Sequence, residues 1–225
     1  MMESKIQEAV QLDGAVKFLN GIYLLKEKAV WCSVTKSLFI ADPHFGKAGH
    51  FRKSGISIPE SIHMADYEVI KFLIELYQPK HFYFLGDLFH SALNKQWQVL
   101  ELFLQGYDNI KFILIKGNHD ILPKNIYKSS VLKIYSEPFL VGSLLLSHEP
   151  IDSIPEGTIN LCGHLHPGFA INSFGNQKTR LPCYHYKSRQ LILPSFGKFT
   201  GIVCLPCHPG DRIYIIGPNG VIPFN

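Results

Sequence analysis

The sequence predicts an α/β fold in which two mixed sheets pack face to face with helices outside. The first half of the chain alternates apolar runs with helical patterns, and the second half holds mainly short strand patterns. In addition, 46% of the 225 residues are hydrophobic and 12% are aromatic, which is enough to bury a sizeable core. The sequence contains no repeat and no linker rich in Gly, Ser or Pro, so we expect one domain over residues 1–225.

The N-terminal region predicts three short strands. Residues 15–25 and 29–35 have strand patterns that can pair as a hairpin, and Asn20-Gly21 is typical of a turn or a bulge. The run SLFIA, residues 37–41, is apolar after its first residue and predicts a buried strand.

Two helices and two further buried strands are expected next. Residues Pro59–Tyr77 predict a helix because apolar side chains recur there at helical spacing and proline suits a first turn. The runs HFYFL (81–85) and KFILI (111–115) predict strands. Between these runs, Asn94 can cap a helix that continues to about Leu104.

The second half of the chain is expected to be mostly β. Its strand patterns cover residues 131–135, 139–147, 158–162, 180–186, 190–193, 201–204 and 212–216. Sheets therefore account for most of this half, and the helices come mainly from the first half.

Two stretches carry basic residues and no Asp or Glu. Gly157–Gly210 contains Lys178, Arg180, Lys187, Arg189 and Lys198, and Pro43–Pro59 contains Lys47, Arg52 and Lys53. Both stretches lie beside candidate site residues, and a basic surface next to a reaction centre attracts polyanions. Ordinary solvated faces are the alternative interpretation. The segment Tyr184, His185 and Tyr186 lies among these basic residues and predicts either a nucleic-acid contact or an exposed strand face.

The sequence predicts no membrane partner and a cytoplasmic location. No apolar run reaches the length of a membrane helix, and the first fourteen residues lack the apolar segment of a signal peptide.

The five cysteines are an odd number without the spacing of a disulfide framework. Cys204, Cys207 and His208 form CLPCH, which matches a haem-attachment pattern, and CxxC can also bind zinc or serve redox chemistry. We expect reduced structural thiols instead, because prolines flank and split the stretch and no second CxxC exists.

Polar residues that could bind a metal follow five of the apolar runs. They are Asp42-Pro43-His44, Gly86-Asp87, Gly117-Asn118-His119-Asp120, Ser147-His148 and Gly163-His164-Leu165-His166. In α/β sheets, ligands bind at the carboxyl ends of the strands, so we expect these segments to meet. For each residue alone, a hydrogen-bonded polar side chain is the simpler interpretation.

The spacing of these residues supports the metal interpretation. Side chains two apart on an extended segment point the same way, so Asp42 and His44 can reach one cation together. The glycines allow sharp turns and close approach of the backbone. Imidazole and carboxylate ligands suit Mn, Fe, Zn or Co better than Ca or Mg, and the absence of thiolates argues against a structural zinc site.

The ordered series DPH, GD, GNHD, H and GHLH, across residues 42–166, resembles the motifs of the calcineurin-like metallophosphoesterases. The resemblance implies a single such domain with a four-layer α-β-β-α sandwich. It also implies two divalent ions, with Mn²⁺ first and Fe, Zn or Co as alternatives. Asp42, His44 and His166 would bind one ion, and Asn118, His148 and His164 the other. Asp87 would bridge them, and a hydroxide shared by both ions would attack phosphorus in line.

Further residues are candidates for catalysis and substrate binding. His119 resembles the family histidine that stabilises the transition state or protonates the leaving oxygen, and Asp120 would orient it or cap a helix. The candidates for substrate contacts are Lys47, His50, Arg52, Lys53 and His90. Phe45 and Phe51 would stack on bases or, as the simpler alternative, pack in the core.

The stretches ADPHFGKAGHFRKSGISIP, FLGDLFHS and LSHEP resemble the ligase-associated DNA damage response endonucleases called PdeM. This narrower resemblance weakens after about residue 180. It implies a DNA substrate and a role in DNA repair, with a DNA ligase and other repair proteins as partners. It does not specify the oligomeric state. Two alternatives stay open: a small-molecule phosphatase or nucleotide pyrophosphatase with a closed pocket, and a protein-binding scaffold, which would tend to lose ligands.

Overall fold

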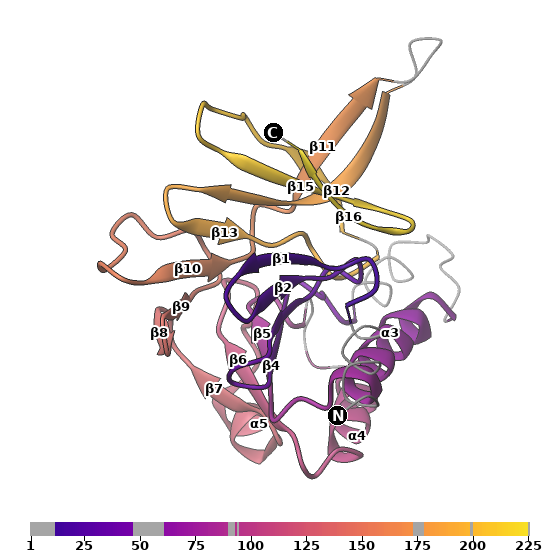
Figure 1. Ribbon diagram of the computed structural model, residues 1–225. Coiled ribbons are helices and arrows are strands. Elements are labelled where there is room, and N and C mark those ends of the chain that lie inside the picture. The colour runs from indigo at the N-terminus through magenta and orange to yellow at the C-terminus, as the bar shows by residue number, and fades with distance from the viewer. Residues whose placement is uncertain are drawn as a thin grey trace, which may run out of the picture.

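The structure is a computed structural model that describes residues 12–46, 61–89, 93, 95–172, 178–198 and 200–224. It confirms the predicted fold class, because two mixed sheets pack against each other and helices lie outside (Figure 1).

The first sheet has seven strands in the order β1-β2-β3-β4-β5-β6-β7. Their bounds are β1 Val16–Leu19, β2 Ile22–Leu24, β3 Val30–Cys32, β4 Ser37–Ala41, β5 His81–Leu85, β6 Lys111–Ile115 and β7 Lys133–Tyr135. The strands from β1 to β4 pair antiparallel, whereas β4 to β7 are parallel. The carboxyl ends of these four parallel strands therefore meet at one edge.

Three helices of the described residues cover the outer face of this sheet: α3 Ser61–Tyr77, α4 Lys95–Gln105 and α5 Lys124–Ser129. Side chains alternate along each strand, so Phe82 and Phe84 of β5 face the helices and pack with Leu73 of α3. The α3 helix ends at Tyr77 as predicted, and its expected start at Pro59 lies outside the described residues.

The second sheet has nine strands. Their bounds are β8 Phe139–Val141, β9 Leu144–Leu146, β10 Ile159–Cys162, β11 Pro167–Asn172, β12 Lys178–Lys187, β13 Gln190–Ile192, β14 Val203–Cys204, β15 Arg212–Gly217 and β16 Gly220–Phe224. The main path is β14-β11-β12-β13-β10-β9-β8, and β15 pairs with β12 and with β16. The parallel strands β9 and β10 end at the same edge as the parallel strands of the first sheet.

The core between the sheets is apolar and fully enclosed. Phe39 and Leu85 of the first sheet pack with Leu161 and Tyr184 of the second. The Tyr184 hydroxyl donates to the Leu25 carbonyl oxygen, 2.7 Å away, and the side chain is 0% exposed. The expectation that Tyr184 contacts nucleic acid or lies on an exposed face is therefore wrong, because this residue belongs to the core.

The outer face of the second sheet carries a small apolar cluster around Cys183, Ile213 and Ile215, and no helix of the described ranges covers it. All five cysteines are free, and Cys204 and Cys207 are exposed. Burial raises the pKa of the Cys183 thiol to about 12, so this cysteine is protonated at neutral pH.

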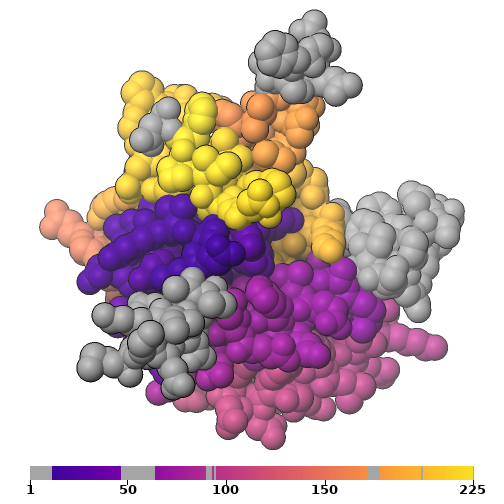
Figure 2. Space-filling model, turned by 45° about the vertical axis from the view of Figure 1, so that its right-hand side comes forward, coloured from indigo at the N-terminus to yellow at the C-terminus, as the bar shows by residue number. Residues whose placement is uncertain are grey.

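A long hairpin formed by β11 and β12 projects from the body of the molecule, as Figures 1 and 2 show in orange. Its strands pair antiparallel from Gly168↔Pro182 to Asn172↔Lys178. Within the described part of the chain, no helix is long and apolar enough to cross a membrane.

Candidate metal centre

The structure brings the predicted ligands together from the ends of five strands. Asp42 and His44 follow β4, Asp87 follows β5, Asn118 follows β6, His148 follows β9, and His164 and His166 follow β10. The first four of these residues come from the first sheet and the three others from the second. The edge where both sheets end is therefore the place where the donors meet.

One group of donors consists of Asp42, His44 and His166, whose ligand atoms lie within 4.8 Å of one another. Nε2 of His166 lies 3.6 Å from Oδ1 of Asp42. Nε2 of His44 lies 3.9 Å from Oδ2 of Asp87, so Asp87 reaches toward this group.

A second group surrounds Nε2 of His148. This atom lies 2.9 Å from Oδ1 of Asn118, 3.1 Å from Nδ1 of His164 and 3.4 Å from Oδ1 of Asp87. The two carboxylate oxygens of Asp87 thus face different groups, because Oδ2 is nearer His44 and Oδ1 nearer His148.

Backbone contacts orient the His148 ring. Its Nδ1 lies 3.2 Å from the carbonyl oxygen of Leu85, to which it can donate a hydrogen bond. In that tautomer the lone pair is on Nε2, the atom that faces the other donors. The main-chain N–H of His148 donates to the carboxylate of Glu137, which fixes the start of this loop.

Five of the seven predicted ligands have a left-handed backbone, with φ between 47° and 66°. They are Asp42, His44, Asp87, His164 and His166. Such a conformation costs a residue other than glycine about 1–3 kcal/mol and persists where the surrounding structure imposes it. Its concentration at this edge indicates that the loops hold these side chains in place at the expense of local stability.

Two glycines allow the loops to approach closely. A Cβ at position 86 would lie 2.2 Å from Nδ1 of His148, and one at position 163 would lie 2.4 Å from Oδ2 of Asp42. The main-chain N–H of His164, next to Gly163, donates to the same Oδ2 at 2.8 Å. The motif glycines are thus required by close contacts with the predicted ligands.

The donor set fits a divalent cation. Oδ1 of Asp42 and Nε2 of His166 are buried and have no hydrogen-bond partner within the described ranges. An unsatisfied buried carboxylate oxygen is costly, and coordination of a cation would compensate for it. Imidazole, carboxylate and amide donors are those of Mn, Fe, Zn or Co sites.

The two predicted catalytic residues take different positions. His119 is exposed at the mouth of the site, and its main-chain N–H donates to Oδ1 of Asp87 at 3.0 Å. Asp120 is buried and accepts N–H groups from Gly117 at 2.8 Å and Leu88 at 2.9 Å. Burial raises the pKa of Asp120 to about 6 against these hydrogen bonds.

Asp120 therefore joins the loop after β6 to the loop after β5. It caps no helix, because α5 begins after Pro123 and has no side-chain cap. The helix-cap interpretation of Asp120 is wrong.

The five candidates for substrate contacts, Lys47, His50, Arg52, Lys53 and His90, lie outside the described residues, as does Phe51. Phe45 is buried and stacks on Tyr67 with ring centroids 4.9 Å apart, so it packs in the core as the simpler alternative expected.

Sequence reasoning missed two contributors to the site. Glu149 lies with His148 and His164 in a third group of possible ligand atoms, and its position directly after His148 was the available signal. The Ser195 hydroxyl donates to the main-chain oxygen of Asp42 at 2.8 Å. No motif marks Ser195, because its role depends on a pairing of its segment with the end of β4.

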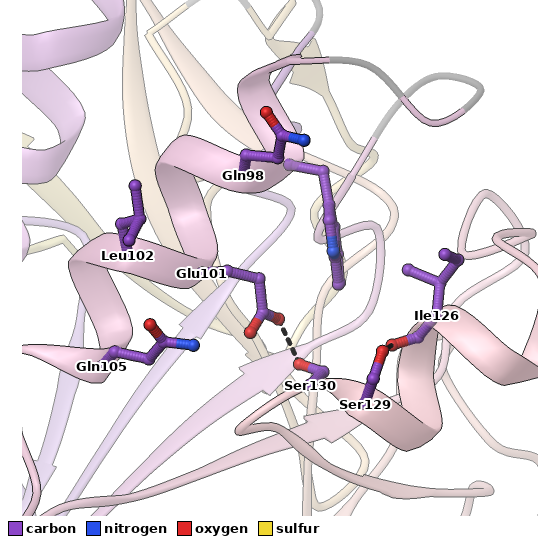
Figure 3. Close-up of a pocket in the computed structure, with 8 residues that line it drawn as sticks. Gln98, Glu101, Leu102, Gln105, Ile126, Ser129 and Ser130 are labelled. Atoms are coloured by element: carbon purple, nitrogen blue, oxygen red, sulfur yellow. Dashed lines mark hydrogen bonds between the residues drawn. The ribbon is translucent and has the colours of Figure 1, made fainter.

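A separate hollow of about 430 Å³ lies between α4 and α5 (Figure 3). None of the predicted ligands lines it. The Ser130 hydroxyl donates to Glu101 across this hollow and so links α4 to the residue that follows α5.

Comparison with protein families decides the identity of this fold. The family model described as calcineurin-like phosphoesterase matches residues 35–211 of the 225. The chain belongs to the calcineurin-like phosphoesterase family. The resemblance seen in the motifs is thereby confirmed, and the protein is a phosphoester hydrolase. Membership in this metallophosphoesterase family implies divalent metal ions, for which the donor groups above are the candidate sites.

Two solved structures are similar to this calcineurin-like phosphoesterase, and the first of them supports the fold. The nuclease MPE of Pseudomonas putida superimposes with a TM-score of 0.73 and 24% identity, over 93% of this chain and 98% of that chain. The phosphoesterase YfcE of E. coli gives a TM-score of 0.44 and 14% identity, over 83% of this chain and 96% of that chain. The comparison with curated proteins gives no match.

Proposed function

We propose that this calcineurin-like phosphoesterase is a dinuclear metal-dependent phosphodiesterase that cleaves DNA, with residues 1–225 as one catalytic domain. The observation that carries the proposal is the arrangement of two donor groups on either side of Asp87, whose oxygens face His44 at 3.9 Å and His148 at 3.4 Å. A carboxylate between two groups of nitrogen and oxygen donors is suited to bridge two cations.

Asp42, His44 and His166 would hold one ion, Asn118, His148 and His164 the other, and Asp87 both. Mn²⁺ is the proposed metal, and Fe, Zn or Co are the alternatives that the same donors accept. Such ions supply a lowered pKa for a water molecule and neutralise charge on the phosphoryl oxygens.

The protein residues have separate tasks in this proposal. His119, exposed at the mouth, would donate a proton to the leaving oxygen as a general acid. Its backbone N–H donates the 3.0 Å hydrogen bond to Asp87, which fixes the position of the proton donor relative to the bridging carboxylate. Asp120 would act as a positioning residue through the backbone N–H groups that it accepts.

Three features support DNA as the substrate. Asn118, one of the proposed ligands, and the neighbouring His119 are exposed, so the site is open to a large substrate. The sequence from 157 to 210, which contains His164 and His166, has five basic residues and no acidic residue. The fold is similar to that of a Pseudomonas putida nuclease. The motif likeness to the ligase-associated endonucleases adds a proposed role in cytoplasmic DNA repair beside a DNA ligase.

The test is a substrate panel with protein reconstituted with Mn²⁺, Fe²⁺, Zn²⁺ or Co²⁺. We expect cleavage of DNA and of bis-p-nitrophenyl phosphate, and a large loss of both after treatment with EDTA. Cleavage of p-nitrophenyl phosphate or dinucleoside polyphosphates with no cleavage of DNA would replace the nuclease by a small-molecule enzyme. Cleavage of none of them would support a scaffold instead.

A further inference from the structure

We infer that one face of the β11–β12 hairpin is a binding surface for the DNA backbone, several nucleotides from the bond that is cleaved. The inference rests on the proposed function and adds a subsite to it. The surface, called the basic arm below, consists of Lys178 and Arg180 of β12.

The arm is an extension of the metal centre. His166 is directly followed by Pro167, the first residue of β11, so the chain passes from a predicted ligand into the hairpin without a connecting loop. The partner strand β12 runs from Lys178 to Lys187, with no irregularity of register in its antiparallel pairing with β11. A continuous ladder therefore fixes the arm relative to the site.

The register determines which face carries the charges. Side chains alternate along a strand, so Lys178 and Arg180 share a face with Tyr184, whereas Leu181 and Cys183 lie on the other. Tyr184 packs between the two sheets, and Leu181 and Cys183 belong to the outer cluster. The two basic residues thus lie on the face of the second sheet that is directed toward the first sheet.

This face is open beyond the body of the molecule. Ile202 lies over Gly168 near the base of the hairpin, but Ala170, Lys178 and Arg180 are exposed. Arg180 is opposite Ala170, whose small side chain leaves the guanidinium accessible. Figure 1 shows the end of the hairpin projecting beyond the rest of the second sheet.

Charge complementarity selects the partner. The sequence from 157 to 210 has no acidic residue, so nothing in the hairpin sequence neutralises the two cations. Arginine matches phosphate oxygens with two parallel hydrogen bonds, and lysine adds a point charge. A polyanion with evenly spaced phosphates, which is the substrate of the proposed chemistry, fits this pair.

The spacing gives a length for the subsite. Ala170 is four residues after His166 and Asn172 is six, which correspond to about 13 Å and about 20 Å along a strand. DNA has one phosphate per 3.4 Å of rise on each strand, so Arg180 and Lys178 would contact phosphates about four and six base pairs from the cleaved bond. Short substrates cannot make these contacts.

The experiment compares DNA of increasing length with bis-p-nitrophenyl phosphate, for wild-type protein and the double variant K178A/R180A. For the wild-type protein we expect kcat/KM to rise until the DNA extends about six nucleotides beyond the cleaved bond. For the variant we expect a loss of about tenfold or more on long DNA relative to its loss on the small ester. We also expect the salt slope of DNA binding to fall by about two, one for each lost phosphate contact.

Two matched variants control for general electrostatics. K111A/K133A removes the same charge at exposed positions where β6 and β7 begin, and we expect wild-type rates on long DNA. T179R/R180T keeps the net charge but moves the guanidinium to the opposite face, where Thr179 pairs with Ile171. We expect this swap to be as defective on long DNA as the single variant R180A, measured alongside it, with an unchanged melting temperature.

The outcomes separate the arm from the nuclease proposal. Wild-type protein that cleaves the small ester but no DNA of any length would overturn both. Wild-type cleavage of DNA with equal rates in K178A/R180A, or full activity of T179R/R180T, would overturn the arm alone. A length-dependent defect confined to the arm variants would support it.

Discussion

Gly86 and His148 are in direct contact across the two sheets, so that a Cβ at position 86 would lie 2.2 Å from Nδ1 and 2.3 Å from Cγ of the imidazole. The ring is buried and oriented by the carbonyl oxygen of Leu85. It has no space to withdraw without leaving the donor group around its Nε2.

The first prediction follows from this contact. Gly86→Ala would force the His148 ring to move and would place an alanine at φ 71°, so we expect a loss of about 2–4 kcal/mol of stability and weaker metal binding. Urea denaturation and metal analysis measure both effects. The control is Gly142→Ala, at φ 60° with no atom within 4 Å of the added Cβ, which should lose about 1 kcal/mol and keep its metal. Equal behaviour of the two variants would contradict the contact argument.

Asp87→Asn tests the bridging carboxylate. Asparagine keeps an oxygen for the N–H of His119, but it removes the charge between the two donor groups. We expect metal content to fall below two equivalents per chain and turnover to fall about a hundredfold or more. Elemental analysis and the bis-p-nitrophenyl phosphate assay give these values. Asp152→Asn, at an exposed position, should be unaffected. Two full equivalents in Asp87→Asn would remove the bridging role.

His119→Ala tests the proton donor. The side chain is exposed, and its main-chain N–H, which alanine retains, makes the contact with Asp87. We therefore expect normal metal content and a rate reduced about 10²–10⁴-fold, as for the loss of a general acid. His208→Ala, also at an exposed position, should keep the wild-type rate. Wild-type turnover in His119→Ala would exclude this histidine from the mechanism.

Asp66 on α3 makes stability depend on pH. The side chain is 4% exposed, and burial raises its pKa to about 6, although the Lys198 backbone N–H and the charges of Lys198 and Lys28 act in the opposite direction. The folded protein therefore binds the proton more tightly than the unfolded chain, and ionisation of Asp66 removes stability as pH rises from about 4 to 6.

Asp66→Asn removes this effect while keeping a hydrogen-bond acceptor. We expect the free energy of unfolding of the variant, relative to wild type, to rise between pH 4 and pH 7 by at most about 3 kcal/mol, and to stay level above pH 7. Urea titrations at several pH values measure the difference. Asp108→Asn, outside this cluster, serves as the control. A constant difference across the range would show that Asp66 is ionised equally in both states.

Much of the frame around the site was predictable because its strands are buried on both faces. The runs at 37–41, 81–85 and 111–115 coincide with β4, β5 and β6 residue for residue. Continuous apolar runs of this length, each followed by a polar motif, leave little choice of register or boundary.

Other elements gave no clear signal. The stretch 139–147 was expected as one strand, but it is the hairpin β8–β9, whose turn contains Gly142 at φ 60°. Because apolar residues continue on both sides of the turn, the sequence pattern does not show that the chain reverses direction there. The six-residue helix α5 has no side-chain cap, and β11 and β16 have mixed composition. The strands among them are fixed by hairpin pairing, β8 with β9, β11 with β12 and β16 with β15, which their composition does not indicate.

The residue types of the candidate site could be predicted from the sequence, but the backbone conformations and hydrogen bonds that position them could not. Asp42 and His166 could be found from motifs, whereas their left-handed backbones depend on how the loops pack. The role of Asp120 also required the fold, because the N–H groups of Leu88 and Phe89 that it accepts come from a loop more than thirty residues earlier. Contacts of this kind leave no local pattern.

The donors of each proposed ion come from both sheets, since Asp42 joins His166 and Asn118 joins His148. An ion bound in either group would therefore cross-link the two sheets at this edge. The metal content of the protein and the stability of the packing between its two sheets would then change together. A chain without metal would lose its catalytic ions and also the bonds that hold the two sheets together at this edge. We expect proteolysis of such a chain to begin there.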